Sequence, residues 1–206
     1  MKKIVPLFFS LALVMQAGAQ EEQKKEPFIR RGLLRNEATF STGSMFSQGV
    51  TNVYLQGGIE YYISDNVSIR GEGYYFVTSL GNFQPFAFHH SVMSGASYHF
   101  KTKNHFDPYF GLAPGISITA MNVPTGIYCD PGPCTGETMA GKTNIDPLAT
   151  LHLGFNLYFQ RWFHLFMETN YIYGRHFSDY PAESLSELRF SFGLGWNIFV
   201  LKKPKV

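Results

Sequence analysis

The stretch TNVYLQGGIEYYI, residues 51–63, decides the fold class of this chain. Its odd positions are mostly apolar, as at Leu55 and Ile59, whereas its even positions include Gln56 and Glu60. Successive side chains of a β-strand point to opposite faces, so this pattern gives one apolar face and one polar face. The stretch is therefore predicted to be a long strand that separates two different environments.

The same period of two recurs on both sides of this stretch. It is equally clear in 106–120, 147–159 and 188–200, less regular in 67–78, 86–101 and 163–175, and weak in 37–46. These segments are long for soluble proteins, whose strands usually have about 5 or 6 residues, while tilted strands that cross a bilayer need roughly 9 to 11. Eight antiparallel strands are therefore predicted.

The connections and the polar faces indicate how these strands are arranged. Short links at 64–66, 102–104 and 160–161 alternate with longer ones at 79–85, 121–144 and 177–186, and only the short link at 47–50 departs from this order. The polar faces are rich in Gly and Ser and contain few Lys or Glu. We expect an all-β protein, an eight-stranded antiparallel up-and-down transmembrane β-barrel with short periplasmic turns and longer extracellular loops. The alternative is a soluble periplasmic sandwich, in which the apolar face would be the core.

Aromatic residues gather near the short turns. A girdle at the membrane interface would explain them, because an amphipathic ring is stable there. The residues assigned to this girdle are Tyr61, Tyr62, Tyr98, Phe100, Phe106, Tyr109, Tyr158, Phe159, Trp162 and Phe163.

The first residues have the pattern of a secretory signal peptide. Lys2 and Lys3 precede an apolar run, and Ala17-Gly18-Ala19 comes just before a polar segment. A signal peptide is therefore predicted at 1–19, with cleavage after Ala19. The apolar run is shorter than the roughly 20 residues that a spanning helix needs. We expect export to the cell outer membrane of a Gram-negative-type bacterium.

The rest of the chain is divided by composition. A flexible charged leader is expected at 20–36, the barrel at 37–201 and a basic tail at 202–206. No second long apolar run occurs, which excludes a helical membrane protein. The net charge of +2 gives no reason to expect a nucleic acid partner.

Two short motifs resemble a known family. Gly95-Ala96-Ser97-Tyr98-His99-Phe100, followed after a polar turn by Asp107-Pro108-Tyr109-Phe110-Gly111, is similar to the central hairpin of the OmpA/OmpX-like outer-membrane β-barrel superfamily. The resemblance implies an eight-stranded barrel whose short turns lie in the periplasm, with no appended peptidoglycan-binding domain. The partners would be outer-membrane lipid, lipopolysaccharide and the barrel assembly machinery, and we expect a monomer. Val206 departs from the terminal aromatic residue that many such barrels carry.

Charged residues fall on the polar face of several predicted strands. An eight-stranded barrel is just wide enough for side chains to fill its interior, so we expect these residues to pair with one another and block the lumen. A gated pore or proton path, that is, a narrow channel, is the alternative. The residues are Glu60, Arg70, Glu72, His152, Glu168 and Arg189.

The longest predicted loop contains both cysteines. Cys129 and Cys134 bracket the turn-forming segment 130–133, and in an oxidising compartment we expect them to form a disulfide. No second cysteine pair supports a metal site there. His89 and His90 are adjacent on a strand and point to opposite faces, which argues against a shared metal site. No cofactor or metal is expected.

The segment near His176 resembles the His-x-Ser motif of lipid A deacylase barrels. The resemblance implies His176 as base, Ser178 as nucleophile and Glu183 or Glu187 as orienting acid, an arrangement used for acyl hydrolysis. Asp179 stands where that family has Asn. The parity of His176 also places it on the lumen side, although a nucleophile for membrane lipid should face the lipid.

The leading expectation is a non-enzymatic outer-membrane barrel that serves envelope structure, adhesion or surface recognition through its loops. The alternatives are a lipid A deacylase-like hydrolase, a narrow channel and a soluble periplasmic sandwich. The fold supports the leading roles only by analogy.

Overall fold

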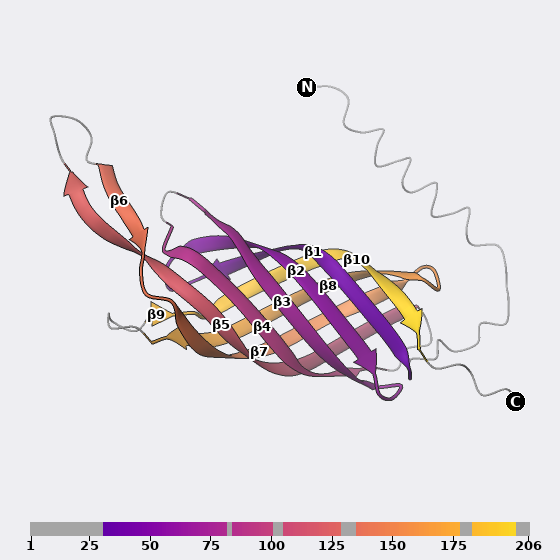
Figure 1. The fold of residues 1–206 in the computed structure, drawn as a ribbon. Coiled ribbons are helices and arrows are strands. Elements are labelled where there is room, and N and C mark those ends of the chain that lie inside the picture. The colour runs from indigo at the N-terminus through magenta and orange to yellow at the C-terminus, as the bar shows by residue number, and fades with distance from the viewer. Residues whose placement is uncertain (1–30, 82–83, 101–104, 129–134, 178–182, 201–206) are drawn as a thin grey trace, which may run out of the picture.

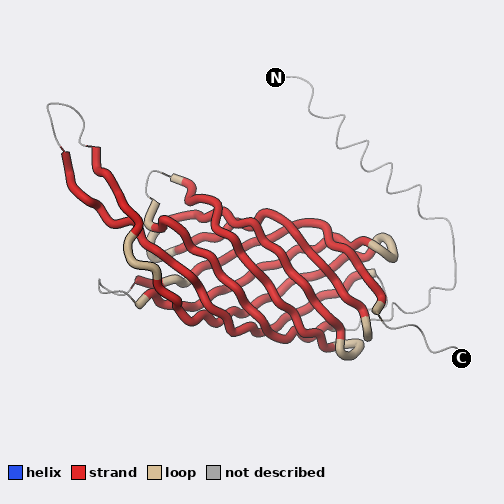
Figure 2. The backbone as a smooth tube through the Cα atoms, in the orientation of Figure 1, coloured by secondary structure: helices blue, strands red, loops and turns tan. Residues whose placement is uncertain are grey.

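The computed structural model describes residues 31–81, 84–100, 105–128, 135–177 and 183–200. No helix in these ranges is long and apolar enough to cross a membrane. The regular structure there is β-strand (Figure 2). The strands are β1 Leu33–Met45, β2 Val50–Tyr62, β3 Val67–Leu80, β4 Phe86–His99, β5 Phe106–Tyr128, β6 Thr135–Ala140, β7 Asn144–Tyr158, β8 Phe163–His176, β9 Glu183–Ser184 and β10 Glu187–Phe199.

Eight of these strands close into an antiparallel barrel (Figure 1). Each long strand pairs with the next one along the chain, and β10 pairs with both β8 and β1. The pairing of β10 with β1 closes the ring, so no strand of the ring is a terminal edge strand, which is the condition for a sheet to lie in hydrocarbon. The predicted fold class is confirmed.

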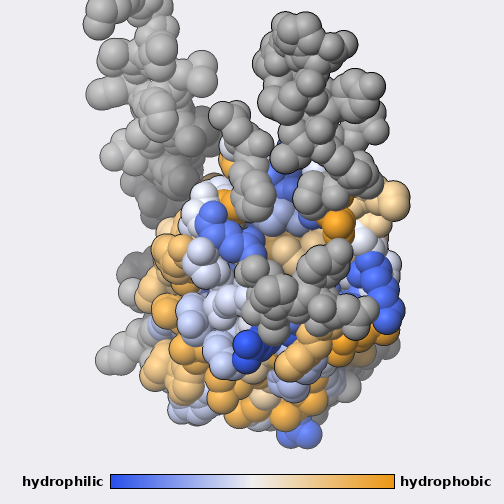
Figure 3. Space-filling model, turned by 90° about the vertical axis from the view of Figure 1, so that its left-hand side faces the viewer, coloured by the Kyte–Doolittle hydropathy of each residue, from blue (hydrophilic) through white to orange (hydrophobic). Residues whose placement is uncertain are grey.

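The burial pattern of the strands is the reverse of that in a soluble protein. In β10, Arg189 and Ser191 are buried inside the barrel, whereas Phe190 and Phe192 lie on the outer face, about half exposed. The other long strands alternate in the same way, and hydrophobic residues form much of the flank visible in Figure 3. Large apolar residues cover an outer surface that soluble proteins would make polar.

The barrel has two unlike ends. We call the end with the links 63–66, 100–105 and 159–162 the turn end, and the opposite end the loop end. At the loop end, β1 and β2 are joined by a tight turn in which Gly49 has a φ of 64° and donates its N–H to the carbonyl of Met45. A positive φ is readily adopted by glycine, which explains this residue at the turn.

Two boundaries differ from the predicted ones. The first strand begins at Leu33 rather than Glu37, so residues 33–36 belong to β1 and not to a flexible leader. The segment 121–144 is not simply a loop, because β5 continues to Tyr128 and pairs with β6 to form a hairpin that extends past the barrel (Figure 1). The turn-forming residues 130–133, which favour a loop, lie outside the described residues.

The predicted aromatic girdle is only partly on the outer face. Tyr98, Phe100 and Trp162 are exposed near the turn end, as expected for an interface residue. Three other members, Tyr62, Tyr109 and Tyr158, are buried inside the barrel. Their hydroxyl groups have hydrogen-bond partners there, so these rings belong to the interior.

Candidate functional site

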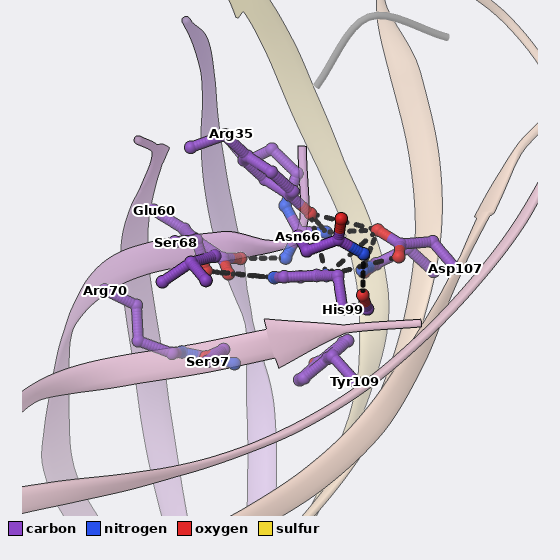
Figure 4. A network of polar contacts seen from close by, with 12 residues as sticks. Arg35, Glu60, Asn66, Ser68, Arg70, Ser97, His99, Asp107 and Tyr109 are labelled. Atoms are coloured by element: carbon purple, nitrogen blue, oxygen red, sulfur yellow. Dashed lines mark hydrogen bonds and ion pairs between the residues drawn. The ribbon is translucent and has the colours of Figure 1, made fainter. Parts of the chain in front are cut away.

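The interior of the barrel is the candidate site, because charged and polar side chains from all eight strands of the ring meet there. Figure 4 shows the part near the turn end. A buried charge is costly unless it is paired and hydrogen-bonded. The contacts of three buried arginines therefore define how the interior is organised.

Arg35 of β1 is at the centre of the turn-end group. Its Nη2 forms ion pairs with Glu60 of β2 and, at 3.1 Å, with Glu37 of its own strand. Its Nη1 donates to the hydroxyl oxygens of Tyr62, at 3.0 Å, and Tyr158, at 3.2 Å. One guanidinium group thus holds together side chains from β1, β2 and β7.

His99 extends this group towards β3 and β5. Its Nε2 lies 3.0 Å from Glu60 Oε1 and 2.9 Å from Ser68 Oγ, and its Nδ1 lies 3.2 Å from both carboxylate oxygens of Asp107 (Figure 4). Tyr62 donates to Asp107 at 3.0 Å. The turn-end group is therefore a continuous network across the lumen.

Arg70 of β3 forms the middle group. It makes ion pairs with Glu72 and, at 2.5 Å, with Glu168 of β8. Its guanidinium carbon lies 5.4 Å from the ring centre of Tyr109, whose hydroxyl donates to Glu168 at 2.7 Å. Arg70 is therefore surrounded by the Tyr109 ring of β5 and by two carboxylates, one from β3 and one from β8.

Arg189 of β10 forms a third group nearer the loop end. Its Nε donates to Glu187 and its Nη1 to Ser91 of β4, both at 2.7 Å. Its guanidinium carbon lies 4.0 Å from the ring centre of Tyr54 and 4.5 Å from that of Tyr74. These are short distances for a cation above an aromatic ring, and the group is fully buried.

Beyond Arg189, the interior at the loop end contains an apolar cluster. Phe76, Phe86, Met93 and Leu185 pack there in one buried cluster. Buried polar side chains lie towards this end as well, among them Asn52, His89, Asp146 and His176, so the interior there is mixed.

The structure brings four of the six predicted lumen residues into one network. Glu60 joins it through Arg35. Arg70 joins it, with Glu72 and Glu168, through Glu37, which lies 3.9 Å from Arg70 Nη2 and also pairs with Arg35. Arg189 lies in the third group, which meets this network through Tyr74, whose hydroxyl donates to Glu72 at 3.3 Å. His152 is also inside but contacts Ser97 Oγ, at 2.8 Å, rather than a carboxylate.

Sequence reasoning missed several members of the network. The sequence pattern places Arg35 in the leader and Glu37 in a weakly patterned strand, because their segment has little apolar alternation. Asp107 and His99 occupy the alternate positions of their strands that face the interior. This alternation is visible in the sequence and could have identified both residues as interior residues. Their partners lie on other strands and cannot be read from one segment.

The residues of the hydrolase alternative are only partly described. Ser178 lies outside the described residues, and of Glu183 only the backbone pairing with His176 is known. His176 is buried, and its Nδ1 lies 2.7 Å from the carboxylate of Asp146. Glu187 instead contacts Arg189, so Asp146 is the described acid beside His176.

Comparisons with known proteins bear on the fold. No protein-family model and no curated protein matches the chain. The solved structure of outer membrane protein OprG from Pseudomonas aeruginosa aligns with a TM-score of 0.58 over 82% of this chain and 97% of that one, at 12% identity. Neisserial surface protein A aligns with a TM-score of 0.53 over 81% of this chain and 96% of that one, at 11% identity.

The chain has the fold of the small outer-membrane β-barrels. Identities this low establish the fold alone. The fold that the superfamily resemblance implied is therefore confirmed.

The remaining candidate residues of this outer-membrane-type barrel lie apart. His89 is inside, with Nδ1 3.2 Å from the Tyr54 hydroxyl, while His90 is only partly buried and stacks on Tyr75. Within the described ranges, no group of three or more His, Cys, Asp or Glu side chains could hold a metal ion. Cys129 and Cys134, with their predicted disulfide, lie outside those ranges.

Proposed function

We propose that this protein is an integral protein of the bacterial outer membrane that acts without catalysis, in envelope structure, adhesion or surface recognition. The observation that carries the proposal is the inverted barrel, with Phe190 and Phe192 outside and Arg189 inside. An apolar outer surface is stable in lipid, and the buried charges are paired. The interior groups around Arg35, Arg70 and Arg189 support a lumen closed to ions.

The recognition surface in this proposal is the loop end. The β5–β6 hairpin extends past the barrel there (Figure 1), and loops on a rigid scaffold commonly carry binding residues. The short turns would face the periplasm and the hairpin the medium, as in other outer-membrane barrels.

The location is tested by fractionation and heat-modifiability. The protein should be found in the outer-membrane fraction, and its mobility on SDS gels should shift on boiling, because a closed barrel resists detergent. Recovery from the soluble periplasm without a shift would support the sandwich instead.

Surface labelling tests the orientation. Thr138→Cys in the hairpin and Asp65→Cys at the turn end would each be made in a Cys129→Ser/Cys134→Ser background, and intact cells would be treated with a membrane-impermeant maleimide. Thr138 is exposed in the structure. Labelling of the Thr138 variant alone is expected, and labelling of the Asp65 variant alone would reverse the orientation.

Planar-bilayer recording separates the closed barrel from a narrow channel. The purified protein should show no stable conductance steps. Reproducible conductance steps from the wild-type protein would contradict the proposal of a closed lumen. A bilayer without the protein is the control, because steps that are absent there cannot come from leakage of the bilayer itself.

A second candidate function is acyl hydrolysis, favoured by the contact between His176 and Asp146. A carboxylate that holds a histidine ring is the orienting arrangement of hydrolytic triads. Changing Ser178 to Ala or Asp146 to Asn would then restore acyl chains to lipid A, measured by mass spectrometry of extracted lipid. Unchanged lipid A in both variants would exclude this function.

A further inference from the structure

The wall of the barrel is not fully paired between β3 and β4. Their pairing stops at Tyr74 and Ser91, although β3 continues to Leu80 and β4 begins at Phe86. Beyond that point β3 pairs only with β2, and β4 only with β5. We call the facing segments 75–80 and 86–90 the seam, which lies at the loop end (Figure 1).

The strands on either side of the seam carry irregularities that favour this separation. The β2–β3 register shifts between Val53 and Tyr54, and the β4–β5 register shifts between Phe86 and Phe88. A β-bulge bends its strand and increases the local twist. Two register shifts beside the seam are therefore consistent with facing edges that depart from the geometry of a regular ladder.

A histidine side chain takes the place of the missing strand partner. The backbone N–H of Phe76 donates to Nδ1 of His90 at 3.0 Å. The His90 ring is stacked between Tyr75, with ring centres 4.4 Å apart, and Phe88, at 5.6 Å. These contacts hold the His90 side chain across the seam. Without it, the part-buried backbone N–H of Phe76 would lack this hydrogen-bond partner.

This hydrogen bond requires a neutral imidazole. Nδ1 accepts only through its lone pair, so the ring proton must be on Nε2. Protonation adds a hydrogen to Nδ1, and two donors then face each other. Protonation of His90 is therefore incompatible with the contact that spans the seam.

The groups around His90 offer little compensation for a positive charge. Tyr75 is the titratable group facing it from β3, and β5 contributes Ile118 as its register partner and Ser117, which donates to the His90 carbonyl. His89 is its neighbour in β4 but points into the barrel. The described hydrogen bonds and ring contacts of His90 include no carboxylate.

We propose that the seam is a pH-sensitive switch, closed when His90 is neutral and open when His90 is protonated. Histidine is the side chain whose charge most readily changes between pH 5 and 8, and only the neutral ring can accept the hydrogen bond from Phe76. Opening breaks the hydrogen bond from Phe76 to His90 and lets the unpaired segments of β3 and β4 move apart. It also loosens the cover over Phe76 and Phe86, which belong to the apolar cluster inside the loop end.

Amide hydrogen exchange measured by NMR in lipid nanodiscs tests the switch directly. Protection factors, corrected for the intrinsic rate at each pH, would be compared at pH 8 and pH 5 for Phe76 and Tyr74. The Phe76 amide should lose about fivefold or more of its protection at pH 5, since one hydrogen bond contributes about 1 kcal/mol. Tyr74, which remains within the paired region, should keep its protection.

Two variants separate protonation from a general loosening of the barrel. His90→Asn places an amide oxygen near the position of Nδ1, and should protect Phe76 at both pH values. His90→Phe keeps the ring but removes the acceptor, and should leave Phe76 unprotected at both. Equal wild-type protection at pH 8 and pH 5, or wild-type protection in the Phe variant, would overturn the proposal.

Discussion

Arg35 of β1 and Glu60 of β2 form an ion pair inside the barrel, where their side chains are 0% and 4% exposed. The same arginine lies 3.9 Å from Asp107 of β5. One cation thus compensates carboxylates from strands that are far apart in the sequence. The pair therefore links the side chains of β1 and β2 inside the barrel.

Changing Arg35 to Met should strongly destabilise the folded barrel. Removing one partner of a buried ion pair costs about 3 to 5 kcal/mol, because the remaining charge is left uncompensated. The free energy of unfolding would be measured by denaturant titration in lipid vesicles. Arg175→Met is the matched control, since Arg175 is exposed, and equal effects of the two changes would contradict the assignment.

Removal of the Tyr109 hydroxyl should also lower stability. Tyr109 is 2% exposed and donates to Glu168, so Tyr109→Phe leaves a buried carboxylate oxygen without this donor at a cost of about 1 to 3 kcal/mol. Tyr173→Phe, at a position that is 66% exposed, should change the free energy of unfolding little. If Tyr109→Phe left the free energy of unfolding unchanged, the hydrogen bond from the Tyr109 hydroxyl to Glu168 would not stabilise the barrel.

Two glycines should respond to alanine in opposite ways. A Cβ at Gly95 would lie 2.0 Å from the carbonyl oxygen of Leu112, whereas a Cβ at Gly73 would meet nothing within 4 Å. Gly95→Ala should cost about 1 to 3 kcal/mol through overpacking, or prevent folding. Gly73→Ala should be neutral or stabilise the strand by up to about 1 kcal/mol. The heat-modifiable gel shift reports folding of both variants, and a fully folded, unaffected Gly95 variant would disagree with the close approach of β4 and β5.

Charge on the outer face should destabilise the barrel according to depth in the bilayer. Leu151 lies midway along β7 on the exposed face, and Ile63 follows β2 at the turn end. Leu151→Arg should cost about 2 to 4 kcal/mol in lipid and Ile63→Arg about 0 to 1. Unfolding titrations in vesicles would measure both, and similar small effects would argue against a membrane-spanning outer face.

The period of two was sufficient to predict the closed barrel and the side of the wall on which most side chains lie. Glu60, Arg70, Glu72, Glu168 and Arg189 are inside, as their parity predicted. The girdle prediction was less successful, because position near a turn says nothing about parity. Position alone predicts Tyr62, Tyr109 and Tyr158 at the interface, but all three lie inside the barrel.

The sequence by itself determined the number of long strands and the inverted distribution of apolar and polar residues, because alternation is a local property of an extended backbone. Only the tertiary structure decided that Arg35 joins Glu60, that Asp146 lies beside His176 and that His90 spans the seam. Those contacts depend on strand register and on closure of the barrel. Register brings together residues that no single stretch of sequence contains.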